Sequence, residues 1–185
     1  MVVTNPSASF VAVEVFPRSP FPKTGHDHDH CVTTALSAAE SVCAAAGERL
    51  TPIRKRVLEL VWGSHRPIGA YAILDRLKED GRSAAPPTVY RALDFLLGRG
   101  LIHRIESLNA FVGCAHPGES HLVQFLICRS CGMTAELDDR RLGDAIGRSA
   151  AEQGFAIQSR VVELSGVCQA CQSGRPRGAA AHAAR

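Results

Sequence analysis

The stretch PPTVYRALDFLLGRGLIHRIES, from Pro86 to Ser107, decides the fold of this chain. Its first part predicts a helix, because Pro87 suits a first helical turn and apolar residues recur on one face. These apolar positions are Val89, Leu93, Leu96 and Leu97. After Gly98 or Gly100 the apolar period changes to two, which is typical of a strand. The stretch therefore predicts a helix that leads directly into a strand.

The segments on either side extend this pattern. Two further helices are predicted before it, one over residues 52–64 and one between Pro67 and Gly81. An alanine-rich helix over residues 33–46 is predicted in front of them, and a second strand over residues 109–114 follows the first. Three helices and a strand hairpin are typical of a winged helix-turn-helix domain.

The third helix of such a domain enters the major groove of DNA. Outside its apolar face, the predicted third helix carries Thr88, Tyr90 and Arg91. Arg91 suits a guanine edge or a phosphate, Tyr90 a thymine methyl group or the backbone, and Thr88 a phosphate near the helix N-terminus. Tyr71, early in the second helix, is a weaker candidate for a backbone contact. The alternative is an ordinary surface helix, and the pattern alone does not separate the two.

Two cysteine pairs near the C-terminus predict a metal site. Cys128 and Cys131 stand in CRSC, and Cys168 and Cys171 stand in CQAC. Two intervening residues let both sulfurs of a pair reach one ion, and two such pairs complete the closed tetrahedron of a structural zinc site. A redox disulfide is the alternative for a single CxxC motif, but two copies favour zinc.

The second half of the chain predicts a small α/β domain. Residues 122–128 and 155–164 are strand-like, and residues 138–153 predict a helix that Gly154 ends. A sheet this small has open edges, which favour pairing with a second copy of the chain. We therefore expect a homodimer.

The predicted fold class is α+β, with two domains between two tails. Residues 35–115 form the winged helix-turn-helix domain, and residues 116–172 form the α/β dimerisation domain with the four-cysteine site. Residues 1–34 and 173–185 are predicted as disordered tails, because prolines interrupt the first and Gly, Ala and Arg dominate the second. In the first tail, HDHDHC at residues 26–31 offers imidazoles and carboxylates to a divalent ion, the alternative being a solvated extension.

Composition indicates a cytoplasmic globular protein. The 185 residues are 45% hydrophobic, which suffices for two small cores. No apolar run approaches the ~18 residues of a membrane span, and the start lacks the pattern of a secretory signal, so no membrane partner is expected. Seven cysteines, an odd number, suit a reducing compartment better than a disulfide scaffold. A net charge of +3 permits nucleic-acid binding through a local basic face without requiring it.

The segment RLTPIRKRVLELV at residues 49–61, the stretch from Pro86 to Ser107 and the cysteine pairs together resemble the ferric uptake regulator (Fur) family of metal-responsive repressors. The likeness is closest to its zinc-sensing branch, the zinc uptake regulator (Zur) branch, and spans about Cys43 to Cys171. It implies an N-terminal DNA-binding domain and a C-terminal dimerisation domain. The two third helices of such a dimer suit a palindromic double-stranded operator.

The same resemblance implies a regulatory zinc site between the domains. Its ligands would be His103, Cys114, His121 and Glu136, with His116 as an alternative to His121. A thiolate, two imidazoles and a carboxylate suit zinc, whereas an iron sensor is expected to use no sulfur here. Taken singly, each residue has a plainer interpretation as a surface or core side chain. Jointly they predict a regulatory Zn²⁺ ion. With the structural ion of the four cysteines, we expect two Zn²⁺ ions per monomer.

The sequence therefore predicts a zinc-responsive DNA-binding regulator, not an enzyme, that chiefly represses zinc-uptake genes when zinc is bound. An iron- or peroxide-responsive regulator of the same family is one alternative. A second is a thiol enzyme using Cys114 with His103 or His116 as base, although no oxyanion-hole motif accompanies the pair. A zinc-buffering protein that uses HDHDHC is the third.

Overall fold

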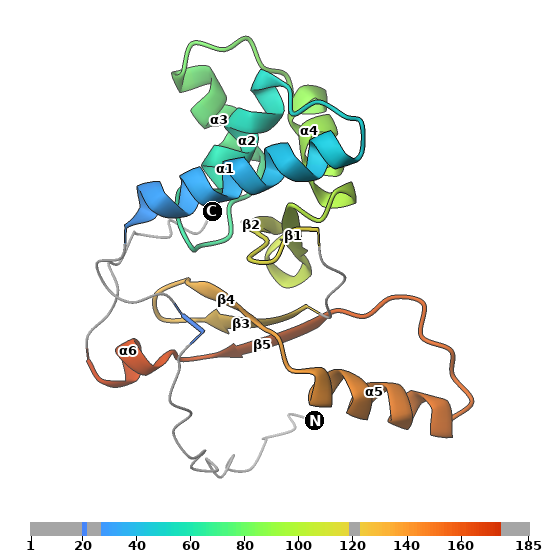
Figure 1. Cartoon of the computed structure of the whole chain (residues 1–185). Helices are drawn as coiled ribbons and strands as arrows, with labels where there is room; N and C mark the ends of the chain where they lie inside the picture. Colours follow the sequence, from blue (N-terminus) through green and yellow to red (C-terminus); the bar gives the residue numbers. More distant parts are fainter. Residues whose placement is uncertain (1–19, 22–26, 119–122, 175–185) are drawn as a thin grey trace, which may run out of the picture.

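The computed structural model describes residues 20–21, 27–118 and 123–174, which form a helical lobe and a sheet lobe (Figure 1). The helical lobe contains α1 (His28–Ala45), α2 (Pro52–Trp62), α3 (Ala70–Glu79), α4 (Pro86–Gly98), β1 (Ile102–Ile105), the 3-10 turn η1 (Glu106–Leu108) and β2 (Ala110–Gly113). The sheet lobe contains β3 (Gln124–Cys128), β4 (Thr134–Leu137), α5 (Arg140–Glu152), β5 (Val162–Gly166) and α6 (Gln169–Gln172). Among the helices of this described part, none is both long and apolar enough to cross a membrane.

The helices α2, α3 and α4 pack around one core. Both α2 and α4 begin with a proline, at Pro52 and Pro86, where the missing N–H is not needed by the helix. The apolar faces of the three helices meet, and this burial stabilises them more than helix propensity does. The fully buried side chains of this core include Val57, Leu58, Ile73, Leu77, Leu93 and Leu96.

The first helix begins earlier than predicted. α1 starts at His28 rather than near residue 33, so the predicted N-terminal tail is too long. The reason is a helix cap, because the Asp27 carboxylate accepts hydrogen bonds from the backbone N–H groups of Asp29 (2.9 Å) and His30 (3.3 Å). From Asp27 onward, HDHDHC is therefore the start of a helix. Residues 1–19, 22–26 and 175–185 of the predicted tails lie outside the described residues.

The wing of the helical lobe is a two-stranded antiparallel hairpin, β1 and β2. Its register runs from Ile102 opposite Gly113 to Ile105 opposite Ala110. At its tip η1 leads into Asn109, whose φ of 45° is the left-handed conformation that asparagine tolerates better than most residues. The hairpin thus carries a short helical turn whose first N–H groups point out of the strand ladder.

The sheet of the second lobe has the strand order β4-β3-β5, with β3 antiparallel to β4 and parallel to β5. β4 was not predicted, because its four residues, Thr134–Leu137, are too few for their alternation to stand out. A turn creates it: the Gly132 N–H donates to the Cys128 carbonyl oxygen (2.8 Å), and the Cys128 N–H donates to the Met133 carbonyl oxygen (2.9 Å). Gly132 has a φ of 71°, which glycine adopts without strain.

The last strand is shorter than predicted. Residues 155–161 are strand-like in sequence, but only Val162–Gly166 pairs with β3. Phe155 and Val161 are 67% and 58% exposed. No described strand lies beside these residues, so their β propensity has no ladder to join. The helix α5 falls within its predicted range, and the Asp139 carboxylate accepts the Arg141 N–H (2.9 Å) at its start.

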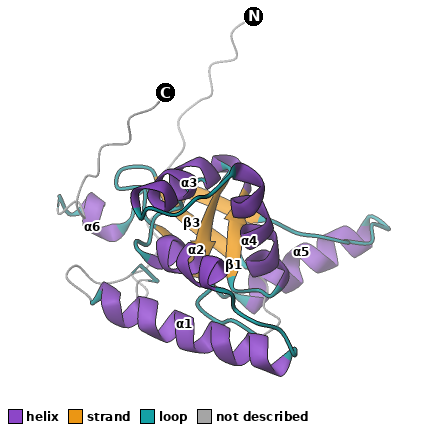
Figure 2. Cartoon of the chain, turned by 90° about the horizontal axis from the view of Figure 1, so that it is seen from above, coloured by secondary structure: helices purple, strands orange, loops and turns teal. Residues whose placement is uncertain are grey.

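A small apolar cluster joins the two lobes. Ile105 and Val112 of the wing pack with Phe125 and Ile127 of β3. Viewed from above, β1 and β3 overlap, while α1 runs along one edge and α5 extends away from the sheet (Figure 2). Figure 1 likewise places the wing against the face of the sheet. Anything held between wing and sheet therefore lies at the boundary of the lobes.

Candidate metal centres and DNA-binding surface

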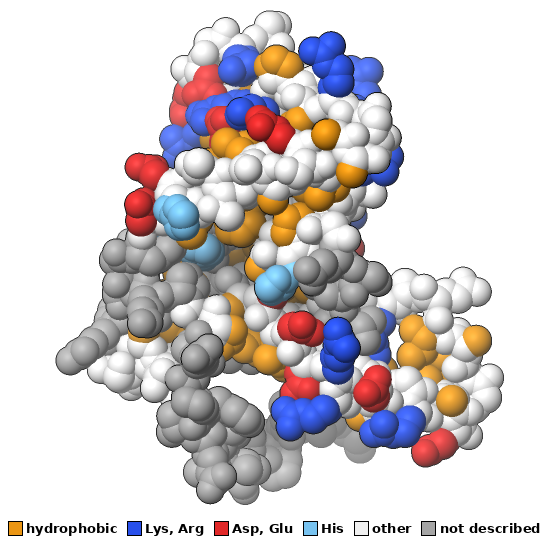
Figure 3. Space-filling model, viewed as in Figure 1, with side chains coloured by type: hydrophobic (Ala, Val, Ile, Leu, Met, Phe, Trp, Pro, Cys, Tyr) orange, Lys and Arg blue, Asp and Glu red, His pale blue; other side chains and the backbone are white. Residues whose placement is uncertain are grey.

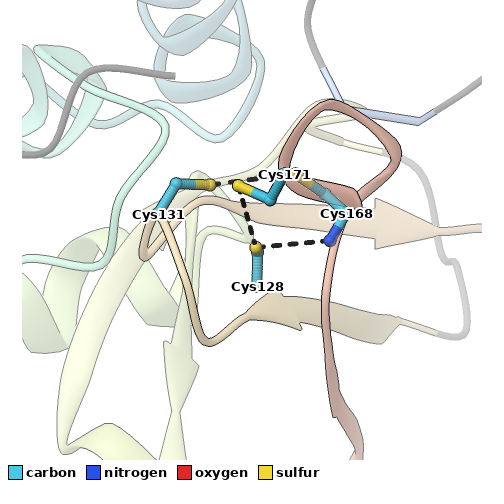
Figure 4. Close-up of side chains that lie close together, drawn as sticks. All are labelled: Cys128, Cys131, Cys168 and Cys171. Atoms are coloured by element: carbon cyan, nitrogen blue, oxygen red, sulfur yellow. Dashed lines mark hydrogen bonds between the residues drawn. The ribbon is translucent and has the colours of Figure 1, made fainter. Parts of the chain in front are cut away.

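Four cysteine side chains converge at one end of the sheet lobe (Figure 4). β3 ends at Cys128, and the turn that follows carries Cys131. Because β5 runs parallel to β3, it delivers Cys168 to the same end, where α6 adds Cys171. The Sγ atoms of Cys128 and Cys171 lie 3.9 Å apart, and those of Cys131 and Cys168 also lie 3.9 Å apart.

These separations fit one tetrahedral ion. Sulfurs 2.3 Å from a zinc ion at tetrahedral angles lie about 3.8 Å from one another. Three of the cysteines are buried and Cys171 is half-buried, so the cluster is closed to solvent on most sides. Four sulfur donors in a closed arrangement are the donor set of structural zinc. The four-cysteine cluster predicted from the two CxxC motifs is therefore present.

Three of the thiols have shifted pKa values. Burial raises the pKa of Cys128, but hydrogen bonds from backbone N–H groups, chiefly that of Cys168 (3.3 Å to Sγ), outweigh it and lower the pKa to about 6. Burial and the neighbouring thiols raise the pKa of Cys171 to about 12. Burial also raises the pKa of Cys131. Backbone N–H groups thus favour the thiolate form of Cys128, and a bound cation would favour the thiolate form of Cys131 and Cys171.

A second cluster lies between the lobes. His103 of β1, Cys114 directly after β2 and Glu136 of β4 each place one ligand atom within 4.8 Å of the other two. The Nε2 atom of His103 is 3.5 Å from Oε1 of Glu136. The side chains of His103 and Glu136 are 18% and 12% exposed, and Cys114 is 1% exposed. An imidazole, a thiol and a carboxylate in a largely dry site match the donors that zinc takes in proteins.

Cys114 is fixed from two directions. Its N–H donates to the carbonyl oxygen of Leu101 (3.1 Å), which continues the hairpin beyond β2. The preceding residue, Gly113, lies against the indole of Trp62, and a Cβ at Gly113 would be 2.1 Å from that ring. Only glycine permits this approach, so α2 sets the position of the end of β2.

Glu136 and His103 are held by the wing and the sheet. Oε1 of Glu136 accepts a hydrogen bond from the N–H of Ala115 (3.1 Å), which ties β4 to the end of the wing. The ring centroid of His103 lies 5.6 Å from that of Phe125 on β3. The cluster therefore contains two residues of the helical lobe and one of the sheet lobe.

The fourth predicted ligand of this cluster is not placed by the structure. His121 lies outside the described residues. The alternative, His116, lines a cavity of about 370 Å³ together with Glu136, Trp62 and His65. It is not a member of the three-residue cluster. The choice between the two histidines stays a prediction.

The predicted DNA-contacting residues lie on the surface of the helical lobe. Tyr90 is 43% exposed and Tyr71 is 69% exposed. Arg91 is exposed on α4, and Thr88 in the first turn of α4 is half-buried. On the face drawn in Figure 3, Lys and Arg side chains lie over both lobes, interspersed with Asp and Glu. Tyr71, Tyr90 and Arg91 are therefore accessible to a partner.

Two polar residues that the sequence did not predict, Arg66 and Glu163, join the lobes. Nε of Arg66, in the loop before α3, donates to the carbonyl oxygen of Cys131 (2.8 Å). The carboxylate of Glu163 on β5 accepts hydrogen bonds from the wing tip. Neither residue belongs to a motif, and each contact joins segments that are distant along the chain. Pairing of β5 with β3, if predicted in register, is the one signal that points to Glu163.

Comparison with known proteins adds three findings. The model of the ferric uptake regulator family matches residues 45–165, well over half of the chain. The zinc uptake regulation protein of Escherichia coli (strain K12) is 42% identical over 137 residues, covering 74% of this chain and 80% of that protein. The zinc uptake regulation protein of Mycobacterium tuberculosis (strain ATCC 25618 / H37Rv) is 30% identical over 133 residues, covering 70% of this chain and 99% of its own.

Solved structures share the fold. A zinc uptake regulator complexed with zinc and DNA superposes with a TM-score of 0.73 at 40% identity, covering 77% of this chain and 96% of that one. The structure of holo XcZur gives a TM-score of 0.69 at 43% identity, covering 76% of this chain and 98% of that one. The predicted α+β fold class, with its winged helix-turn-helix and four-cysteine cluster, is confirmed.

Proposed function

Because the chain belongs to the ferric uptake regulator family, we propose that it is a zinc-responsive DNA-binding transcription regulator. The observation that carries the proposal is the cluster of His103, Cys114 and Glu136, which draws its residues from both lobes. Membership in a family of regulators agrees with the prediction that the chain is not an enzyme. One of the solved structures that share this fold is a zinc uptake regulator bound to both zinc and DNA.

The donor set favours zinc over iron. Cys114 contributes sulfur, and a thiolate beside an imidazole and a carboxylate suits zinc, whereas iron and manganese sensors are expected to rely on nitrogen and oxygen. We take His121 as the fourth ligand, with His116 as the alternative. The sulfur donor of Cys114 supports zinc as the signal and disfavours the iron- or peroxide-responsive alternative.

The position of the cluster supports a mechanism. His103 and Cys114 belong to the wing, and Glu136 belongs to the sheet lobe. A bound zinc ion supplies the positive charge that lets the thiolate and the carboxylate stand together. These side chains then restrict the angle between the helical lobe, which binds DNA in this proposal, and the sheet lobe, which forms the dimer. Zinc and operator each raise the affinity for the other, with an expected coupling of roughly 1 to 3 kcal/mol.

The four-cysteine cluster has a separate role in this proposal. All four of its residues lie within the sheet lobe, at the ends of β3 and β5 and in α6. A zinc ion there stabilises one lobe without linking it to the other, as structural zinc does. We therefore propose two zinc ions per monomer, one structural and one regulatory.

The DNA-binding role falls to α4. Arg91, Tyr90 and Thr88 are the residues proposed to contact DNA, with Tyr71 of α3 reaching the backbone. The chain is proposed to act as a homodimer in the cytoplasm, so that two copies of α4 face a palindromic operator. Its main targets are proposed to be zinc-uptake genes, repressed when zinc is bound. From Asp27 onward the HDHDHC segment is the capped start of α1, and the zinc-buffering role stays an alternative.

The test is a metal titration of operator binding. A duplex operator is selected from a random library by the zinc-loaded protein, and its affinity is measured against buffered free zinc, iron and manganese. We expect zinc alone to raise the affinity, with two zinc ions per monomer at saturation and one that resists mild chelation. Equal activation by iron or manganese would contradict the zinc assignment. Failure to select any duplex would contradict the DNA-binding role.

A further inference from the structure

Three side chains stand in one row across the sheet of the second lobe. Phe125 of β3 is the register partner of Glu136 on β4 and also of Glu163 on β5. Register partners in neighbouring strands project from the same face of a sheet. Glu136 and Glu163 therefore flank Phe125 on the face that meets the wing, and Figure 1 shows the hairpin lying over this sheet.

Glu163 binds the tip of the wing with both carboxylate oxygens. Oε1 accepts a hydrogen bond from the N–H of Glu106 (2.6 Å), and Oε2 accepts one from the N–H of Ser107 (3.2 Å). These N–H groups open the 3-10 turn η1 and therefore have no partner inside that turn. The side chain of Glu106 pairs with Arg104 (3.3 Å), which offsets its charge next to Glu163. Hydrogen bonds to an ionised acceptor are about twice as strong as neutral ones.

The two glutamates hold the wing at different points. Glu136 accepts the N–H of Ala115 at the end of the hairpin next to the metal-ligand cluster. Glu163 accepts the N–H groups at the opposite end, the hairpin tip. A hairpin fixed at one end pivots, whereas a hairpin fixed at both ends has one orientation on the sheet.

We infer that Glu163 is a positioning residue for the zinc-dependent switch: it latches the wing tip to β5, so that metal binding at the other end sets a single orientation of the DNA-binding lobe. The inference rests on the proposed function. Glu163 is not a metal ligand in this scheme and contacts no DNA. Its effect passes through the angle of the wing, because Glu163 adds two hydrogen bonds at the tip to the apolar contact of Ile105 with Phe125.

The experiment compares Glu163→Gln with the parent and with a control, Glu152→Gln. Glutamine keeps the size of the side chain, but one of its two terminal groups is a donor that cannot accept the second N–H. Glu152 is an exposed carboxylate at the end of α5 in the same lobe. We expect Glu163→Gln to weaken zinc-saturated operator binding about tenfold while both zinc ions remain bound. We expect the control to bind operator as the parent does.

A second measurement needs no DNA. Amide hydrogen exchange at Glu106 and Ser107 should be protected in the zinc-loaded parent and at least about tenfold faster in Glu163→Gln. The latch is overturned if Glu163→Gln has the same amide exchange as the parent. It is also overturned if the parent responds to zinc and Glu163→Gln binds operator with the same affinity. A parent with no zinc-dependent operator binding contradicts the proposed function instead, and amide exchange then decides on the contact alone.

Discussion

The two clusters of potential metal ligands differ in how the chain assembles them. The four cysteines come from short knuckles at the ends of two paired strands, and all lie in the sheet lobe. His103, Cys114 and Glu136 come from both lobes, and the apolar contact between the lobes at this boundary is small. A ligand set inside one lobe stabilises that lobe, whereas a set that spans two lobes controls their relative orientation.

The comparison also separates the chemistry of the two sites. The four-cysteine cluster has sulfur donors only and is closed, as expected of an ion that stays bound. The mixed cluster adjoins a cavity of about 370 Å³ that Glu136 and His116 line, so it has an approach for an ion that exchanges.

The largest effect is expected from Cys128→Ser. Structural zinc contributes about 10 to 16 kcal/mol in small zinc domains, which equals or exceeds the stability of a typical domain. The variant should therefore lose cooperative folding of the sheet lobe and with it the dimer, measured by thermal unfolding and sedimentation. The matched control is Cys31→Ser, a half-buried cysteine of α1 outside both clusters. A folded dimeric Cys128→Ser protein with full zinc content would contradict the structural role.

Cys114→Ser should have the opposite profile. The fold and the four-cysteine zinc should remain, because Cys114 belongs to the other cluster. Zinc-dependent operator binding should be lost, which corresponds to the expected coupling of roughly 1 to 3 kcal/mol. Operator affinity is measured at buffered free zinc, again with Cys31→Ser as control. The sensory assignment is wrong if Cys114→Ser keeps the zinc dependence of the parent.

Arg91→Ala should weaken DNA binding without changing zinc content. A lost guanine or phosphate contact costs about 1 to 3 kcal/mol. Arg82, exposed between α3 and α4, gives a control of equal charge change in Arg82→Ala. Fluorescence anisotropy with the selected operator measures the DNA affinity of both variants. An equal small loss of affinity in the two variants would contradict the placement of α4 in the major groove.

The smallest effect is expected from Asp80→Asn, which lies in neither cluster. The Arg56 guanidinium hydrogen-bonds to this carboxylate (2.6 Å) and lowers its pKa below the usual value. A lowered folded-state pKa stabilises the fold above the unfolded pKa, and this contribution is lost as the pH falls through the folded pKa. The variant should lower the midpoint of thermal unfolding slightly at neutral pH and not at low pH, with metal response unchanged. A changed zinc response would show that the helical lobe influences the switch in a way that the account omits.

The sequence predicted the helical lobe best. The helices α2, α3 and α4 follow from local pattern, because all three carry apolar stripes and α2 and α4 begin with a proline. The start of α1 was missed because one capping aspartate, Asp27, extends a segment that reads as a charged tail. β4 was missed because it is short and depends on the turn at Gly132. Residues 155–161 were overpredicted because strand propensity does not reveal whether a neighbouring strand exists.

The two clusters also differ in how far the sequence predicts them. The four cysteines are predictable from spacing, because CxxC is itself a local geometry. The convergence of His103, Cys114 and Glu136 followed from the family resemblance and not from spacing, since these residues come from three different strands or strand ends. Glu163 escaped prediction because its contact depends on the register between β3 and β5 and on the approach of the two lobes.

The most direct test is a crystal structure of the zinc-loaded protein with anomalous diffraction recorded at the zinc edge. We expect two peaks per chain, one among the four cysteine sulfurs and one between His103, Cys114 and Glu136, with a histidine as the fourth ligand of the second. A single peak among the cysteines, with His103, Cys114 and Glu136 directed away from any shared ion, would contradict the claim that zinc joins the two lobes.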